Sequence, residues 1–320
     1  MSVINVSTGT AGQAGSTAAG LVNDLKPVLL AVSEFDASTE QVIFETETIT
    51  NAKTVQWNRL ERMGVATTPA QLTEGVAPKP EAVTLNSVTA TMEEYGRAVY
   101  FSSLAVLTTK SPLVQQQIKN LGYNLKETRD RLLYAILNAA TNVSRVNDRA
   151  NDNAIALGDV ISFEEVQEFK SVLATAGAPK KPDGTYVLVL HTTQYGSLAV
   201  DPNWLAASQF AYADEIRQGM VNVVLGVRVH ETNSNSYTAT ASTTSGNSSK
   251  IRSAFMAGAG AAKVTDLQAT KVHMQAPGQG ADWMERRYQM GWTGVFKGAI
   301  TNQSFIRKIR ASSNDATAVA

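Results

Sequence analysis

The stretch LTEGVAPKPEAVTLNSVTATMEEYGRAVYFSS at residues 72–103 decides how the rest of the chain is interpreted. Its first part is rich in Gly and Pro, which favours an irregular turn, and its second part is rich in Val, Thr and Tyr, which favours strands. The preceding TNAKTVQWNRLER (50–62) alternates and can pair with it. Residues 50–102 therefore predict an extended two-stranded hairpin with an irregular tip at 63–80. Because a lone hairpin is at best marginally stable in water, this one should lie on another surface.

The return strand of this hairpin changes its alternation part-way along. Val83 and Leu85 share one parity, whereas Val88 and Ala90 share the other. The switch predicts a bulge or a twist near Asn86–Ser87.

A long helix is predicted at residues 111–141. Ser111 can cap it, and Pro112 suits the first helical position. Apolar residues then recur at spacings of three and four. About 30 helical residues would span roughly 45 Å, which is typical of a structural spine. The predicted apolar stripe consists of Val114, Ile118, Leu121, Leu125, Thr128, Leu132, Ile136 and Ala139.

The middle third predicts a mixed α/β unit with interleaved elements. Ser162 and Glu165 form a capping box that opens a helix, and Gly177 and Pro179 end it. Strands are expected at 185–192, 221–232 and about 251–267, a helix at 204–220, and loops at 143–161 and 234–250.

The C-terminal part predicts one or two long strands, with a bend at Gly294 or Gly298. Tyr288, Trp292 and Phe296 share one parity. The predicted core therefore contains Leu121, Leu125, Leu132, Ile136, Tyr288, Trp292 and Phe296.

Composition excludes several classes of function. The 320 residues include no cysteine, so disulfides, thiolate metal sites and a cysteine nucleophile are ruled out. The 28 basic residues balance the 28 acidic ones, whereas a protein that grips nucleic acid usually has a basic excess. A neutral chain favours association. The first 20 residues do not resemble a signal peptide, and no apolar run is long enough for a membrane span.

No motif indicates catalysis, a cofactor or a metal. The Gly-containing runs at 258–263 and 278–283 complete no nucleotide fingerprint, so turns are expected there. His191, His230 and His273 are far apart in sequence and lack metal-ligand spacing. A Ser-His-Asp triad is spatial and is not excluded by spacing, but no G-x-S-x-G elbow is present. The chain is therefore predicted not to be an enzyme, with no catalytic, cofactor or metal residues.

Charge segregates along the chain. Residues 1–50 contain one lysine and six acidic residues, whereas residues 285–310 contain six basic residues and one glutamate. We interpret this as charge matching between subunits, with contact to DNA as the alternative. The predicted intersubunit contacts on the hairpin are Thr73, Glu74, Gly75, Pro78, Glu81, Glu93 and Glu94. The predicted basic partner surface consists of Arg286, Arg287, Lys297, Arg307, Lys308 and Arg310.

The order of these elements and two local patterns resemble one family. The run at 72–103, followed directly by the long helix, is similar to the major coat proteins of tailed bacteriophages of the podophage type. The C-terminal ERRYQMGWTGVFKGAI (285–300) resembles the closing strands of that family. The likeness covers roughly residues 45–145 and 275–312. The matching positions are Thr73, Glu74, Gly75, Pro78, Tyr95, Gly96, Ser102, Ser103, Gly291 and Trp292.

The resemblance implies the α+β capsid fold of tailed phages, often called the Johnson fold. On that basis the division would be an N-terminal arm (1–49), an extended β-hairpin loop (50–102), a peripheral domain with the spine helix (103–161 and 270–320) and an axial α/β domain (162–269). The implied function is a major capsid protein that self-assembles, through hexamers and pentamers, into an icosahedral phage head. Further implied partners are scaffolding, portal and decoration proteins, and packaged double-stranded DNA on the inner face without sequence specificity. Assembly would take place in the host bacterial cytoplasm, without a membrane.

Two alternatives remain at this point. The first is an encapsulin-like shell, which has the same architecture and encloses cargo enzymes. The second is a hydrolase without a recognisable motif, although a long unsupported hairpin would have no purpose in one.

Overall fold

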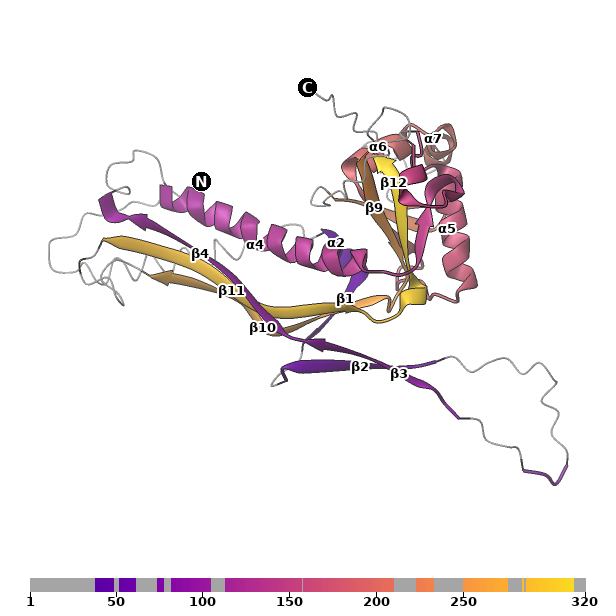
Figure 1. The fold of residues 1–320 in the computed structure, drawn as a ribbon, viewed down its shortest axis with the longest axis horizontal. Coiled ribbons are helices and arrows are strands. Elements are labelled where there is room, and N and C mark those ends of the chain that lie inside the picture. Colours follow the sequence, from indigo (N-terminus) through magenta and orange to yellow (C-terminus); the bar gives the residue numbers. More distant parts are fainter. Residues whose placement is uncertain are drawn as a thin grey trace.

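A computed structural model shows an elongated subunit built on three β-sheets (Figure 1). It describes residues 38–48, 52–61, 74–77, 82–104, 113–156, 158–209, 223–232, 250–275, 284 and 286–313. Most of the predicted arm, most of the hairpin tip, the predicted helix cap, the second half of the helix at 204–220 and most of the loop at 234–250 lie outside these residues.

A long helix packs along one face of a four-stranded sheet. The short helix α2 (Ser38–Ile43) leads into this sheet, and the spine helix α4 (Leu113–Asn138) covers it. Strand β1 pairs in parallel with β10, and the other pairings are antiparallel. The strand order is β1 (Phe44–Thr48), β10 (Ala262–Gln275), β11 (Arg287–Ile300) and β4 (Glu93–Ser102).

The buried face of α4 matches the predicted stripe in its first half and departs from it in the second. Leu121 and Leu125 are buried against the sheet, as predicted. Further along, Leu133 and Leu137 are fully buried, whereas the predicted Leu132 and Ile136 are only half-buried. At 3.6 residues per turn the inward position drifts forward along the helix, so the buried leucines fall one residue after the predicted ones.

Close packing of this helix depends on a glycine in β11. A Cβ atom added to Gly298 would lie 2.9 Å from Cδ2 of Leu133 and 3.1 Å from Cε1 of Phe44. A side chain at that position would force Leu133 or Phe44 to shift. The predicted bend at Gly294 or Gly298 does not divide this segment, because β11 is one continuous strand of 14 residues.

The second unit is a six-stranded sheet covered on both faces. Helix α5 begins at the predicted cap, where Ser162 accepts a hydrogen bond from the Glu165 backbone N–H. Apolar residues of α5 and α6 cover one face, and the C-terminal half of α4 covers the other. The strand order is β5 (Val143–Arg145), β12 (Ile306–Ser313), β9 (Lys250–Ala257), β6 (Tyr186–His191), β8 (Val227–Thr232) and β7 (Val223–Val224). The helices are α5 (Phe163–Thr175), α6 (Thr192–Ala199) and α7 (Pro202–Gln209), with short 3₁₀ turns η1 (Val146–Asp148), η2 (Asp152–Ala154) and η4 (Gln303–Phe305).

The last strand differs from the sequence prediction. The division by sequence places the C-terminal strands together in one peripheral unit. Instead β11 belongs to the four-stranded sheet, whereas β12 pairs with β9 and β5 in the six-stranded sheet. The chain therefore crosses between the two units after Ile300, and the domain bounds given above remain a prediction.

The hairpin is a separate two-stranded sheet that projects from the body (Figure 1). Strand β2 (Thr54–Leu60) pairs with β3 (Leu85–Thr91) in unbroken antiparallel register. A bulge at Asn86–Ser87 is therefore wrong, and the alternative of a twist there stays a prediction. Pairing within the hairpin ends at Thr91, and the chain then changes sheets to begin β4, so the described ladder is shorter than the predicted 50–102 excursion.

Candidate assembly surfaces

The histidines show no catalytic grouping. His191 caps α6 through its ring, and His273 lies 2.8 Å from the hydroxyl of Thr293 on the neighbouring strand. Burial lowers the pKa of His230, and the nearby Arg228 acts in the same direction. Among the described residues no group of His, Asp and Glu side chains could hold a metal ion, and no helix there is long and apolar enough to cross a membrane.

The root of the hairpin is fixed to the subunit body. Val55, Trp57 and Met92 are buried there, against Val295 of β11. Trp57 also donates a hydrogen bond from Nε1 to Oε2 of Glu47, at 3.0 Å. These contacts lie on the face of the four-stranded sheet that is turned away from α4, because Val295 alternates with the helix-facing Trp292 and Phe296.

Beyond its root, the hairpin exposes apolar side chains. Leu60 and Leu85 are directly opposite each other in the ladder, and they are 67 % and 58 % exposed. Val76 and Val83 are exposed as well. Four of the ten exposed large hydrophobic side chains of the described residues therefore lie on this appendage. Apolar groups concentrated in this way are typical of a binding surface.

The predicted acidic contacts of the hairpin have different surroundings. Glu74 and Gly75 form an exposed turn, in which Gly75 has a φ of 81° that favours glycine. Glu94 is exposed. Glu93 belongs to β4 and accepts a hydrogen bond from Nζ of Lys297 in the same chain, at 2.7 Å. Thr73, Pro78 and Glu81 lie outside the described residues.

The Glu93 contact is a local network and not a free acidic surface. Hydrogen bonds from Lys297 and from the Tyr95 hydroxyl lower the pKa of Glu93. Burial, followed by the hydrogen bond to Glu93, raises the pKa of Tyr95 to about 12. The centres of the Tyr95 and Phe296 rings are 4.9 Å apart. Lys297 and Glu93 thus bind each other within one subunit, which corrects their assignment to opposite sides of an intersubunit contact.

Three of the predicted basic residues hold β12 inside the six-stranded unit. Lys308 is 7 % exposed and donates from Nζ to the backbone oxygen of Asn138 at 2.7 Å, and burial lowers its pKa. Arg310 is 9 % exposed and lies 3.6 Å from Asp152. Arg307 donates to Oγ of Ser144 at 2.7 Å. Lys308 and Arg310 are therefore not available as a partner surface.

The remaining predicted basic residues are exposed at the start of β11. Arg286 and Arg287 are both exposed, and the guanidinium of Arg287 lies 5.9 Å from the centre of the Tyr100 ring. Two of the predicted core residues of this strand, Trp292 and Phe296, are buried as expected. The third, Tyr288, is only half-buried.

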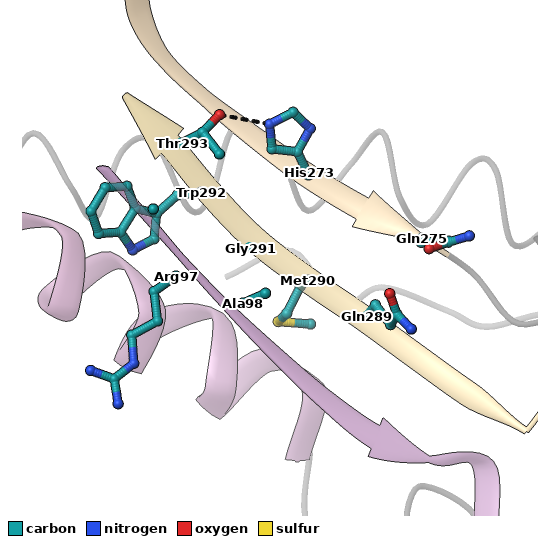
Figure 2. Close-up of a pocket in the computed structure, with 10 residues that line it drawn as sticks. Arg97, Ala98, His273, Gln275, Gln289, Met290, Gly291, Trp292 and Thr293 are labelled. Atoms are coloured by element: carbon teal, nitrogen blue, oxygen red, sulfur yellow. Dashed lines mark hydrogen bonds between the residues drawn. The ribbon is translucent and has the colours of Figure 1, made fainter. Parts of the chain in front are cut away.

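An open groove of about 420 Å³ crosses β4, β11 and β10 (Figure 2). Its lining brings together Gly96 of β4 and the Gly-Trp pair of β11, since Gly96 is opposite Thr293 and Gly291 is opposite Ala98. A Cβ atom at Gly96 would lie 2.7 Å from the carbonyl oxygen of Trp292, and one at Gly291 would lie 2.8 Å from that of Arg97. Only glycine fits these two positions without a shift of the backbone.

An ionic cluster between α2, α4 and β10 was missed by sequence reasoning. Arg129 binds the carboxylate of Glu40 through two nitrogens, and it also donates to Asp266 at 3.0 Å. Its guanidinium lies 4.6 Å from the centre of the Phe296 ring. Burial is the largest single influence on Arg129 and lowers its pKa, but the hydrogen bonds and charges of Glu40 and Asp266 together outweigh it and raise the pKa. The partners are 89 and 137 residues away in sequence, so no local pattern could have indicated them.

A family model described as phage capsid protein matches residues 85–300, more than half of the chain. This chain belongs to the phage capsid protein family. It is a major capsid protein, a structural component of the icosahedral head shell, and the prediction that it is not an enzyme is confirmed. No curated protein sequence matches the chain.

Solved phage capsids share the fold of this capsid protein. The capsid asymmetric unit of cyanophage Pam1 is similar with a TM-score of 0.68 and 11 % identity, over 85 % of this chain and 89 % of that one. The capsid of Ralstonia phage GP4 gives 0.66 and 14 %, over 86 % and 88 %. A virus-like particle from Pyrococcus furiosus gives 0.52 and 10 %, over 90 % and 98 %. The predicted α+β capsid fold is confirmed, and the family match, not the fold alone, identifies this as a phage protein.

Proposed function

We propose that this capsid protein builds its shell by laying the hairpin of each subunit across a neighbouring subunit, within hexameric and pentameric rings. The observation that carries the proposal is the exposed Leu60–Leu85 pair, on an appendage whose described residues are buried against the body only at the root. A contact between two different surfaces can close into a ring, whereas a self-complementary one stops at a dimer.

The wider assembly is also part of this proposal. The subunit would meet scaffolding and portal proteins, and a decoration protein on the finished shell, while double-stranded DNA would lie against the inner face without sequence specificity. Assembly would take place in the host bacterial cytoplasm. Family membership supports these roles, because a shell must be nucleated, sized and filled.

A deletion separates folding from assembly. Removing residues 66–79 and closing the gap with a short Gly-containing turn should leave a folded, soluble subunit that forms no shells. Electron microscopy reports the particles, and circular dichroism with gel filtration reports the fold. Normal shells from this variant would contradict the proposal.

A double substitution tests the role of the exposed leucines directly. Leu60→Ser combined with Leu85→Ser should abolish or greatly reduce shell formation without loss of soluble subunit. Gln56→Ser combined with Thr89→Ser is the matched control, because these two residues form a polar cross-strand pair on the same side of the ladder. Equal assembly of the two double variants would argue against the hairpin contact.

A further inference from the structure

Residues 38–48, which form α2 and β1, connect the two units of the subunit, and we call them the strap. Helix α2 packs on α4 and on strands β6 and β8 of the six-stranded sheet, whereas β1 pairs with β10 of the four-stranded sheet. The apolar anchor of the strap consists of Ile43 and Phe44, which are buried against α4 and the six-stranded sheet, with Val42 packed beside them. The strap is therefore attached to both units, and much of that attachment is polar.

Every charged residue of the strap is a glutamate, and each of the three glutamates is bound to a different part of the subunit. The bound groups are hydrogen-bond donors in all three cases. They are the guanidinium of Arg129 for Glu40, the backbone N–H of Gly260 at 2.6 Å for Glu45, and Nε1 of Trp57 at 3.0 Å for Glu47. Protonation would weaken all three contacts together, because a charged acceptor forms stronger hydrogen bonds than a neutral one.

Two cations of the subunit body depend in part on the strap for their counter-charges. Arg129 binds Glu40, and the Arg129 side chain is 18 % exposed. Lys181 donates from Nζ to the Ile43 backbone oxygen at 3.1 Å; burial lowers the pKa of Lys181, and the charge of Glu45 acts in the opposite direction. A buried cation that loses its counter-charge is strongly destabilising. In acid the strap would therefore become a neutral segment that covers two cations.

We propose that the strap is an acid-sensitive latch: protonation of its three glutamates releases residues 38–48 from both units as one segment, while the six-stranded sheet stays folded. Among the described residues, the apolar cluster between this sheet and helices α5 and α6 contains no member of the strap, so its packing does not depend on the latch. Release would also loosen the hairpin root, because Glu47 binds Trp57 there. The inference goes beyond the proposed function and does not require it, since a single subunit contains the whole latch.

Other charged groups face the strap and set the pH at which it opens. Burial raises the pKa of Asp130, so this carboxyl loses its charge above the ordinary range, which relieves its repulsion of Glu40. Burial, followed by the charge of Arg228, lowers the pKa of His230, so this imidazole gains its charge only below its ordinary range. The strap is therefore expected to be most stable in mildly acidic solution and to open at lower pH. The groups that face it are Lys126, Arg129 and Asp130 of α4, Lys263 and Asp266 of β10, Arg228 and His230 of β8, and Lys181 and Asp183 before β6.

Hydrogen exchange of the free, full-length subunit measures the latch directly. At about pH 3.5, below the ordinary pKa of a glutamate, the amides of the strap should exchange at least about tenfold faster than at about pH 5.5, after correction for the intrinsic rates. Strand β6 should stay protected at both pH values. If β6 loses its protection together with the strap, or if the strap exchanges equally at both pH values, the inference is overturned.

Neutral copies of the glutamates test whether their charge holds the latch. The strap variant combines Glu40→Gln, Glu45→Gln and Glu47→Gln. Its strap should exchange fast already at about pH 7 and should be nearly independent of pH, because glutamine does not titrate. A strap variant with the wild-type pH profile would contradict the proposal. The matched control combines changes at three exposed carboxylates, Glu61→Gln, Glu94→Gln and Glu127→Gln, and should behave as the wild type does.

Two single variants keep the test decisive if the triple strap variant does not fold. Glu40→Gln preserves the size of the side chain and one acceptor oxygen, and it should still speed exchange of the strap at about pH 7 while β6 stays protected. Unchanged exchange of the strap in this variant would count against the latch. His230→Gln should leave the release in acid intact. If it abolishes the release, the imidazole and not the glutamates is the trigger, and the proposal fails.

Discussion

The six-stranded sheet and the hairpin differ in how far their strands are covered by the rest of the chain. Every residue of the central strand β6 is buried, since helices α5 and α6 cover one face of the sheet and α4 covers the other. The described residues of the hairpin bury side chains on one face only, and only at its root. The six-stranded unit is complete within one chain, whereas in the proposed assembly the hairpin is completed by a second molecule. Mutations in the first should therefore be measured as folding defects, and mutations in the second as assembly defects.

The largest effect on stability is expected in the six-stranded unit. Phe255 is fully buried, and its ring meets that of Tyr134 edge-on at 5.2 Å. Phe255→Ala should lower the free energy of unfolding by about 3–5 kcal/mol, which would leave little folded subunit. The matched change in the hairpin, Leu60→Ala, should alter that free energy by no more than about 0.5 kcal/mol and still impair assembly. Urea unfolding of the subunits measures both, and a stable, shell-forming Phe255→Ala variant would break the comparison.

An intermediate effect is expected where α4 meets the four-stranded sheet. Gly298→Ala should destabilise the subunit by about 1–3 kcal/mol, because its methyl group would crowd Leu133 and Phe44. Gly294→Ala is the control in the same strand, since its nearest neighbour would be Oγ1 of Thr270 at 3.3 Å. Thermal unfolding of the two variants compares them directly. Equal losses would show that the surroundings of Gly298 are packed no more closely than those of Gly294 on the same face of the sheet.

The smallest effect concerns a buried carboxylate. Burial raises the pKa of Asp130, against the hydrogen bonds from Thr39 and the charge of Lys126, and the charge of Glu40 adds to the rise. A group with a raised folded-state pKa stabilises the fold below its unfolded pKa, and this contribution is lost as the pH rises through the folded value. Asp130→Asn should therefore match the wild type in acid and become slightly more stable than it towards neutral pH.

The measurement is urea unfolding at several pH values, from the acidic range up to pH 7. Glu127→Gln serves as the control, because that carboxylate is exposed on the same helix and pairs with Arg131. If Asp130→Asn and the wild type show parallel pH profiles, the buried charge of Asp130 does not affect stability.

Local signals in the sequence predicted individual elements well. The helix N-cap at Ser162, the buried strand at β6 and the alternation around Trp57 each depend on residues a few positions apart, and each is confirmed. The reciprocal half of the predicted capping box is wrong, because the Glu165 carboxylate accepts a hydrogen bond from the Asn147 backbone N–H. The buried stripe of α4 was correct as far as Leu125 and then drifted, because a spacing pattern does not fix which of two neighbouring leucines turns inward.

The pairing of distant segments could not be predicted in the same way. Strand β12 has the composition of a strand in either sheet, and its place beside β9 depends on contacts about 55 positions away along the chain. The basic excess counted over the C-terminal segment did not predict an exposed surface, for a related reason. The C-terminal basic excess counted Lys308 and Arg310, whose charges are bound inside the subunit, and a sum over the sequence does not distinguish them from exposed Arg286.

The short strand β1 joins the arm side of the chain to the hairpin, and this position has a mechanical consequence. Tension applied to the chain on either side of β1 would act on this strand, whose five residues pair in parallel with β10. Load along the strand shears the whole ladder at once and does not peel it open one hydrogen bond at a time. The Trp57–Glu47 bond and the Arg129–Glu40 pair anchor the chain on either side of the strand. A shell under internal pressure would thus transmit its load through the core of each subunit, at the pairing of β1 with β10.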